Sequence, residues 1–143
     1  MRLYSADDLT IPSVKLVPDN EPATHDTTCA FSHDGARLFV ANVDGWVRVF
    51  DVATRRELAT ERWKAHTTDI TALTVSQSGE IAATAGGGII TLWSVKTDPT
   101  KPRRERLKLV TGTRSRNWMQ FGGGDTVLLH CAPNYPIEAW EAR

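Results

Sequence analysis

The sequence has little cysteine, no excess of either charge and no long apolar run. Its 143 residues include two cysteines, Cys29 and Cys131, in strand-like surroundings where we expect them to stay reduced. Seventeen Lys and Arg residues balance seventeen Asp and Glu residues, so no net field attracts nucleic acid or an anionic membrane. No uncharged segment reaches the roughly 20 apolar residues that a membrane span needs. We therefore expect neither a nucleic-acid partner nor a membrane partner.

A secretory leader and the usual catalytic constellations are also missing. The first ten residues, "MRLYSADDLT", place two acids where a signal peptide has its apolar core, which favours a cytoplasmic location. The four histidines lie in separate segments, so no catalytic triad is apparent. The stretch "HDTTC" supplies fewer ligands than zinc needs, and neither "GGG" has a P-loop lysine. We predict no catalytic residue, no metal and no cofactor.

Short alternating apolar runs separated by turns are what the sequence does contain. In "HDGARLFVANVDGWVRVFDVATRREL", Leu38, Val40, Val47 and Val49 alternate with polar neighbours, as in half-buried strands. Asp44-Gly45 predicts a hairpin turn between the two runs. Turn signals recur about every 8–12 residues, which is typical of an all-β fold.

This strand-turn pattern repeats along the chain. The segments "AFSHDGARLFVANVDGWVRVFDV", "TVSQSGEIAATAGGGIITLWSV" and "QFGGGDTVLLHCAPNYPIEAWEA" each end in a strand with an aromatic residue. Those aromatics are Phe50, Trp93 and Trp140, and Tyr4 has a similar setting. Their spacings of 46, 43 and 47 residues are close to the roughly 40–45 residues of a four-stranded propeller blade.

On these residues the sequence resembles the WD40-repeat family. In "KAHTTDITALTVSQSGEIAATAGGGIITLWSV", Ala65-His66 stands at the Gly-His position of that family and Trp93-Ser94 at the Trp-Asp position. Phe50-Asp51 and Trp140-Glu141 take the latter place in the other segments. The resemblance implies an all-β fold, a β-propeller segment of four-stranded antiparallel blades that forms an incomplete ring. The implied single domain, 1–143, divides into an incomplete leading blade at 1–22, blade one at 23–63, blade two at 64–111 and blade three at 112–143, which lacks its outer strand.

This register predicts the strand positions. The leading blade has strands near Arg2 to Ser5 and Val14 to Val17. The other blades have strands near Thr27 to Phe31, Arg37 to Ala41, Trp46 to Val52, Glu57 to Trp63, Ile70 to Val75, Ile81 to Thr84, Ile89 to Val95, Leu107 to Val110, Asn117 to Phe121, Val127 to Cys131 and Ile137 to Trp140. Propellers typically have four to eight blades, so three alternatives stay open: a segment of a longer chain, a half-propeller completed by a second copy, or an open array that needs a partner.

The resemblance also implies two groups of site residues. A buried structural network of the WD40 type falls on His66, Thr84 and Trp93, while its turn aspartate is matched by Asp44 in blade one and replaced by Gly87 in blade two. A partner-binding face gathers the loops that join blades and the turns between the second and third strands of each blade. Trp46 lies at the tip of one such hairpin and either anchors a partner or packs on the next blade. The candidates for that face are Asp44, Trp46, Lys64, Thr67, Thr68, Arg114, Arg116, Asn134 and Tyr135.

The function implied is a non-catalytic scaffold for a protein or peptide partner. One alternative is a half-propeller that self-associates into a homo-oligomeric ring. A second is a fragment of a propeller enzyme, because "FDVATRRELATERW" has some likeness to quinoprotein repeats. The basic segment Lys96 to Lys108 is interpreted chiefly as a solvated loop, because charge runs usually are.

Overall fold

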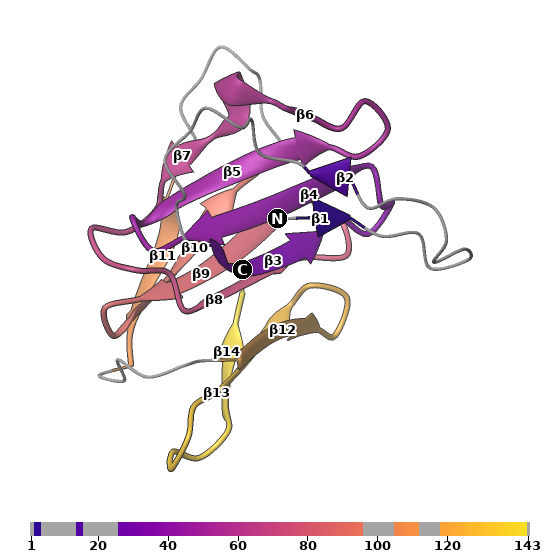
Figure 1. The fold of residues 1–143 in the computed structure, drawn as a ribbon. Helices are drawn as coiled ribbons and strands as arrows, with labels where there is room; N and C mark the ends of the chain where they lie inside the picture. The colour runs from indigo at the N-terminus through magenta and orange to yellow at the C-terminus, as the bar shows by residue number, and fades with distance from the viewer. Residues whose placement is uncertain (1, 4–13, 16–25, 96–104, 112–117, 143) are drawn as a thin grey trace.

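In a computed structural model, the described part of the chain consists of short antiparallel strands in four sheets (Figure 1). The structure describes residues 2–3, 14–15, 26–95, 105–111 and 118–142. Strands β1 (Arg2–Leu3) and β2 (Val14–Lys15) form a two-stranded pair. The larger sheets follow one another as blades, and the described sheets do not close a ring. This arrangement confirms the predicted incomplete propeller, and the described chain contains no helix with the length and hydropathy of a membrane span.

Blade one is built around three long neighbouring strands, β3 (Asp26–Phe31), β4 (Arg37–Asn42) and β5 (Trp46–Asp51). Because successive side chains in a strand point to opposite faces, β4 and β5 supply apolar residues to both faces of this sheet. Leu38 lies opposite Phe50 on one face and Phe39 lies opposite Val49 on the other. All four side chains are buried, so β4 and β5 are covered on both sides.

The predicted outer strand from Glu57 to Trp63 is wrong in its continuity. Instead, β6 (Arg56–Glu57), a 3₁₀ turn (Ala59–Glu61) and β7 (Trp63–Lys64) share the outer position. Glu57 pairs with Phe50 and Trp63 pairs with Val47, so the outer segment has more residues than the edge of β5 that it must follow. The surplus folds into the 3₁₀ turn, which the Glu61 amide closes by donating to Leu58 O at 2.8 Å.

Blade two has the four strands expected of it. They are β8 (Ala72–Val75), β9 (Ile81–Gly86), β10 (Ile89–Ser94) and β11 (Glu105–Val110), paired in that order. The predicted start of the first strand at Ile70 is two residues early. The Ile70 amide donates to Asn42 O of blade one at 3.4 Å and the Thr71 amide to Ala85 O at 2.7 Å, so the chain crosses between blades before β8 begins.

Blade three contains three described strands, β12 (Trp118–Gly122), β13 (Val127–Cys131) and β14 (Glu138–Glu141). Other predicted strand ends shift by one or two residues, and Tyr4, Ser5, Leu16, Val17 and Asn117 lie outside the described residues. Blade three buries Leu128 and Met119 against blade two. On its surface Trp118 is 53% exposed and Ile137 is 70% exposed.

Two of the three clusters of buried hydrophobic residues span neighbouring blades, and the third lies on one face of blade one. Between blades one and two, Trp63 packs edge-on against Phe39 with ring centroids 6.4 Å apart. Trp63 also lies 6.1 Å from Trp93, which brings an aromatic from each blade into one cluster. Each sheet therefore depends on its neighbour for burial, as repeat architectures do, and this packing fixes how the loops of adjacent blades meet.

Candidate functional site: the loops where blades one and two meet

The turn between β4 and β5 is the first component of the site. Gly45 has φ +80°, a conformation that glycine adopts without steric cost, and its amide donates to Asn42 O at 3.1 Å. The Asp44 carboxylate accepts the Trp46 amide at 3.2 Å. Asp44-Gly45 therefore forms the predicted hairpin turn, and the carboxylate fixes the backbone from which the Trp46 side chain projects.

The loop from Lys64 to Ile70 lies directly on this turn. Gly45 O accepts the amides of Ala65 at 2.9 Å and His66 at 3.1 Å. The Lys64 ammonium donates to Asp44 O. A Cβ atom on Gly45 would collide with the carbonyl of His66 and lie 2.7 Å from that of Thr68. Close approach of the two backbones thus requires glycine at position 45, and it holds the two blades in one fixed relation.

The Trp46 indole forms the centre of the exposed part of this junction. Trp46 pairs with Lys64 across β5 and β7, which places the Lys64 ammonium 5.8 Å from the ring centroid. The Arg62 guanidinium lies 5.7 Å from the same centroid. Such contacts contribute about 0.5–1 kcal/mol each at exposed sites. The half-buried indole therefore offers an apolar surface flanked by two cations.

A buried hydrogen-bond network supports the junction from blade two. The Trp93 indole N–H donates to Thr84 Oγ1 at 2.8 Å, and His66 Nε2 lies 2.8 Å from the same oxygen. Both bonds are satisfied when the Thr84 hydroxyl donates to an unprotonated Nε2, which places the ring proton of His66 on Nδ1. The network links the loop residue His66 to two strands, so the loop is positioned by the sheet beneath it.

The structure brings together three of the four residues proposed for that network. Asp44 belongs instead to the turn of blade one, where its carboxylate accepts the Trp46 amide. The corresponding residue of blade two is Gly87, and at Gly86 just before it the backbone approaches closely, since a Cβ there would lie 2.6 Å from Asp69 O and 3.0 Å from His66 Cγ. Glycine at position 86 thus leaves room for the His66 ring.

The proposed partner-binding residues lie at two places in the structure, and two of them fall outside the described residues. Asp44, Trp46 and Lys64 meet at the junction, and Thr67 and Thr68 are exposed on the adjoining loop. Asn134 and Tyr135 lie on the equivalent turn of blade three, where Asn134 has φ +66° and Tyr135 is 55% exposed. Arg114 and Arg116 lie outside the described residues.

Sequence reasoning missed two residues, one at the Trp46 junction and one at the opposite end of the blades. Arg62 was overlooked because the outer segment was treated as one strand, whereas the 3₁₀ turn before Arg62 changes its register relative to Trp46. Asp125 accepts the amides of Gln77 and Ser78, both at 2.7 Å, and so joins blade three to blade two. Its signal in the sequence is its place in the turn "GGGDT", where the other blades have glycine. Among the described residues, no cluster of three or more His, Cys, Asp or Glu residues could hold a metal.

Comparison with known proteins agrees with this geometry. The family model described as "WD domain, G-beta repeat" matches residues 24–51 and 57–94. Among 775 matching solved chains, the Cps50 (Swd1) β-propeller domain of Myceliophteria thermophila aligns with a TM-score of 0.69 at 18% identity. The alignment covers 92% of this chain and 46% of that domain, so this chain spans less than half the length of the neighbour. No curated protein matches the sequence.

Proposed function

We propose that this chain, a propeller segment with two matches to the WD40 family model, is a non-catalytic scaffold that presents the junction of blades one and two to a protein or peptide partner. WD40 propellers generally bind protein partners. The observation that carries the proposal is the Trp46 indole, flanked by Arg62 and Lys64 on a turn fixed by hydrogen bonds from both blades. A cytoplasmic location, expected from the sequence, stays part of this proposal.

The chemistry of this surface favours a particular kind of peptide. Aromatic and arginine residues are the most frequent anchors of protein interfaces, and the part of the indole that Arg62 and Lys64 leave uncovered can pack against an apolar side chain. The cations of Arg62 and Lys64 favour a carboxylate beside that side chain. We therefore propose an extended segment with an apolar residue next to an acidic one, bound across the turn of Asp44 and the loop of Thr67.

The test is selection of peptides on the chain, followed by measurement of their affinity for variants. Trp46→Ala should weaken the selected peptide by more than about 1 kcal/mol, or about fivefold, because the anchor is removed. Trp118→Ala is the matched control, since Trp118 is an exposed tryptophan of blade three, and it should leave the affinity unchanged. Thermal unfolding of both variants shows whether the fold is kept. Equal affinity of Trp46→Ala and the parent chain would refute this function.

A second candidate function is assembly through blade three. Its exposed Trp118 and Ile137 are apolar surface of the kind that marks contact sites, and the known propeller domain is about twice as long as the aligned chain. As this alternative function, we propose that a second copy of this chain binds the exposed surface of blade three. Light scattering during size-exclusion chromatography measures it: a discrete dimer that Trp118→Glu converts to monomer supports self-association, and a monomer for the parent chain contradicts it.

A further inference from the structure

Three turns join the first and second strands of the blades at the end opposite the Trp46 junction. Blades one and two have the same hydrogen bonds here: Gly35 N donates to Ser32 O at 2.9 Å, and Gly79 N to Ser76 O at 3.0 Å. The two glycines also share their conformation, with φ +70° and +71°. The turns of residues 32–36 and 76–80 therefore present their backbone amides in the same way.

In blade two these amides bind a carboxylate from the next blade. The Gln77 and Ser78 amides each donate to one oxygen of Asp125, both at 2.7 Å. Partial burial raises the pKa of Asp125. Hydrogen bonds from these two amides and from the Ser78 side chain, together with the nearby His33, outweigh that effect, so the pKa lies below the ordinary value of 3.8. Asp125 stands in the blade-three turn at the position of Gly35 and Gly79 and shares their positive φ, at +68°. This turn of the fold is thus an anion site, already occupied by an internal group.

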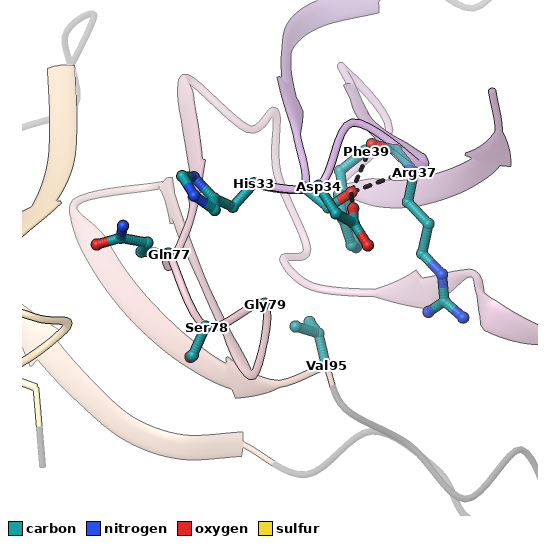
Figure 2. Close-up of a pocket in the computed structure, with 9 residues that line it drawn as sticks. His33, Asp34, Arg37, Phe39, Gln77, Ser78, Gly79 and Val95 are labelled. Carbon is teal, nitrogen blue, oxygen red and sulfur yellow. Dashed lines mark hydrogen bonds between the residues drawn. The ribbon is translucent and has the colours of Figure 1, made fainter.

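The matching amides of blade one belong to His33 and Asp34. Within the described residues, neither amide donates to another residue. The blade-two residue that corresponds to Asp125 is Gly79, which has no side chain to reach them. A cavity of about 360 Å³ lies there instead, bordered by His33 and Asp34 from one turn and Gln77, Ser78 and Gly79 from the other (Figure 2).

The charged groups around the cavity include one that opposes the binding of an anion and two basic side chains. The Asp34 carboxylate is turned toward its own loop, where Ser32 Oγ donates to it at 2.6 Å and Ala36 N at 3.0 Å. It is the nearest competing anion. The Arg37 guanidinium points away from the cavity (Figure 2) and pairs with Glu61 at 2.7 Å. The exposed His33 imidazole borders the cavity. Phe39 and Val95 add apolar wall.

We propose that this cavity is a second binding site, which takes a carboxylate of a partner peptide on the amides of His33 and Asp34. The carboxylate belongs to an acidic side chain or to a chain terminus. At the junction of blades one and two, the ligand carboxylate would accept the turn amides in the way that Asp125 accepts the Gln77 and Ser78 amides at the junction of blades two and three. The site lies at the opposite end of the strands from Trp46, so it does not depend on the function proposed above.

The first test uses acetate as the probe. Titration of the ¹⁵N-labelled chain with sodium acetate, against sodium chloride at equal ionic strength, should move the His33 and Asp34 amide proton signals downfield and to saturation. The Gln77 and Ser78 signals are the internal control, because Asp125 already occupies those amides. Asp34→Asn should bind acetate about threefold more tightly or better, since a like charge is removed. Shifts that do not saturate, or that chloride reproduces, overturn the proposal.

Two further probes distinguish the source of the carboxylate. A capped Gly-Gly-Asp-Gly-Gly peptide offers only a side-chain carboxylate, and acetylated triglycine offers only a terminus. Saturable shifts at His33 and Asp34 with either peptide support the site and identify its ligand, whereas failure of both overturns a peptide ligand. Gly79→Asp supplies the group from within: there is open space around a Cβ at position 79. It should abolish acetate binding, while Gly79→Ala, which adds no acceptor, should keep it.

Discussion

We predict that the hydroxyl of Thr84 contributes to the free energy of unfolding through the two hydrogen bonds made by its oxygen. Thr84→Val replaces that hydroxyl by a methyl group of similar volume, in a side chain that is fully buried. The change removes the acceptor of the Trp93 indole N–H and the partner of His66 Nε2, both at 2.8 Å. Leaving a buried polar group without its partner costs about 1–3 kcal/mol, so two such losses predict a destabilisation of about 2–6 kcal/mol.

Thr91→Val is the matched control for this change. Thr91 lies directly opposite Thr84 in the β9–β10 ladder and is equally buried. Its hydroxyl has no hydrogen-bond partner within the part of the chain that the structure describes. Replacing an unpaired buried hydroxyl by a methyl group removes a desolvated polar atom without breaking a bond, so this variant should be neutral or slightly more stable.

Urea unfolding followed by tryptophan fluorescence measures both variants. With a urea m value of about 2 kcal/mol/M, a loss of about 2–6 kcal/mol lowers the midpoint by about 1–3 M. Thr84→Val should show that shift with an unchanged m value, and Thr91→Val should unfold with the parent chain. If both variants shift equally, the loss belongs to the threonine-to-valine change as such, and the network contributes nothing specific.

Two further predictions concern the turns. Gly45→Ala should destabilise the chain by about 3 kcal/mol or more, because the new Cβ meets the carbonyls of His66 and Thr68. Gly35→Ala, with φ +70° in open space, should cost only about 1–2 kcal/mol. Equal urea midpoints for the two variants would contradict this. Asp125→Asn should unfold at lower urea than the parent at neutral pH. The folded-state pKa of Asp125 lies below 3.8, so its contribution to stability is present above about pH 4 and is lost as the pH falls through the folded value. The difference in urea midpoint between the two chains should therefore disappear at low pH. A difference that does not change with pH would show that the charge of Asp125 is not involved.

The sequence was sufficient for the features that have a strict period. Alternation of Leu38 and Val40 with their neighbours predicted a strand, and the spacing of Phe50, Trp93 and Trp140 predicted the blades. The sequence did not predict a feature that arises because one segment has more residues than the strand edge beside it. The 3₁₀ turn at Ala59–Glu61 arises because the outer segment is longer than the edge it follows, and periodicity does not report that mismatch in length.

Contacts between blades were the other part that could not be predicted from the sequence. The two cations at Trp46 come from a segment sixteen or more residues away along the chain, and their approach depends on the register of β7. Asp125 bonds to amides that are 47 and 48 residues distant. A backbone amide carries no signal in the residue type, so its role as an anion donor appears only when the turns are placed side by side.

The most direct measurement of the central claim follows the tryptophan indole signals during peptide binding. The chain has five tryptophans, so a ¹⁵N-labelled sample gives separate indole N–H signals that single substitutions assign. Titration with a peptide selected on the chain should shift the Trp46 signal strongly and leave the signal of Trp93, which is bonded to Thr84 inside the fold, nearly unchanged. A shift confined to Trp118, with Trp46 unmoved, would contradict a binding surface at the junction of blades one and two.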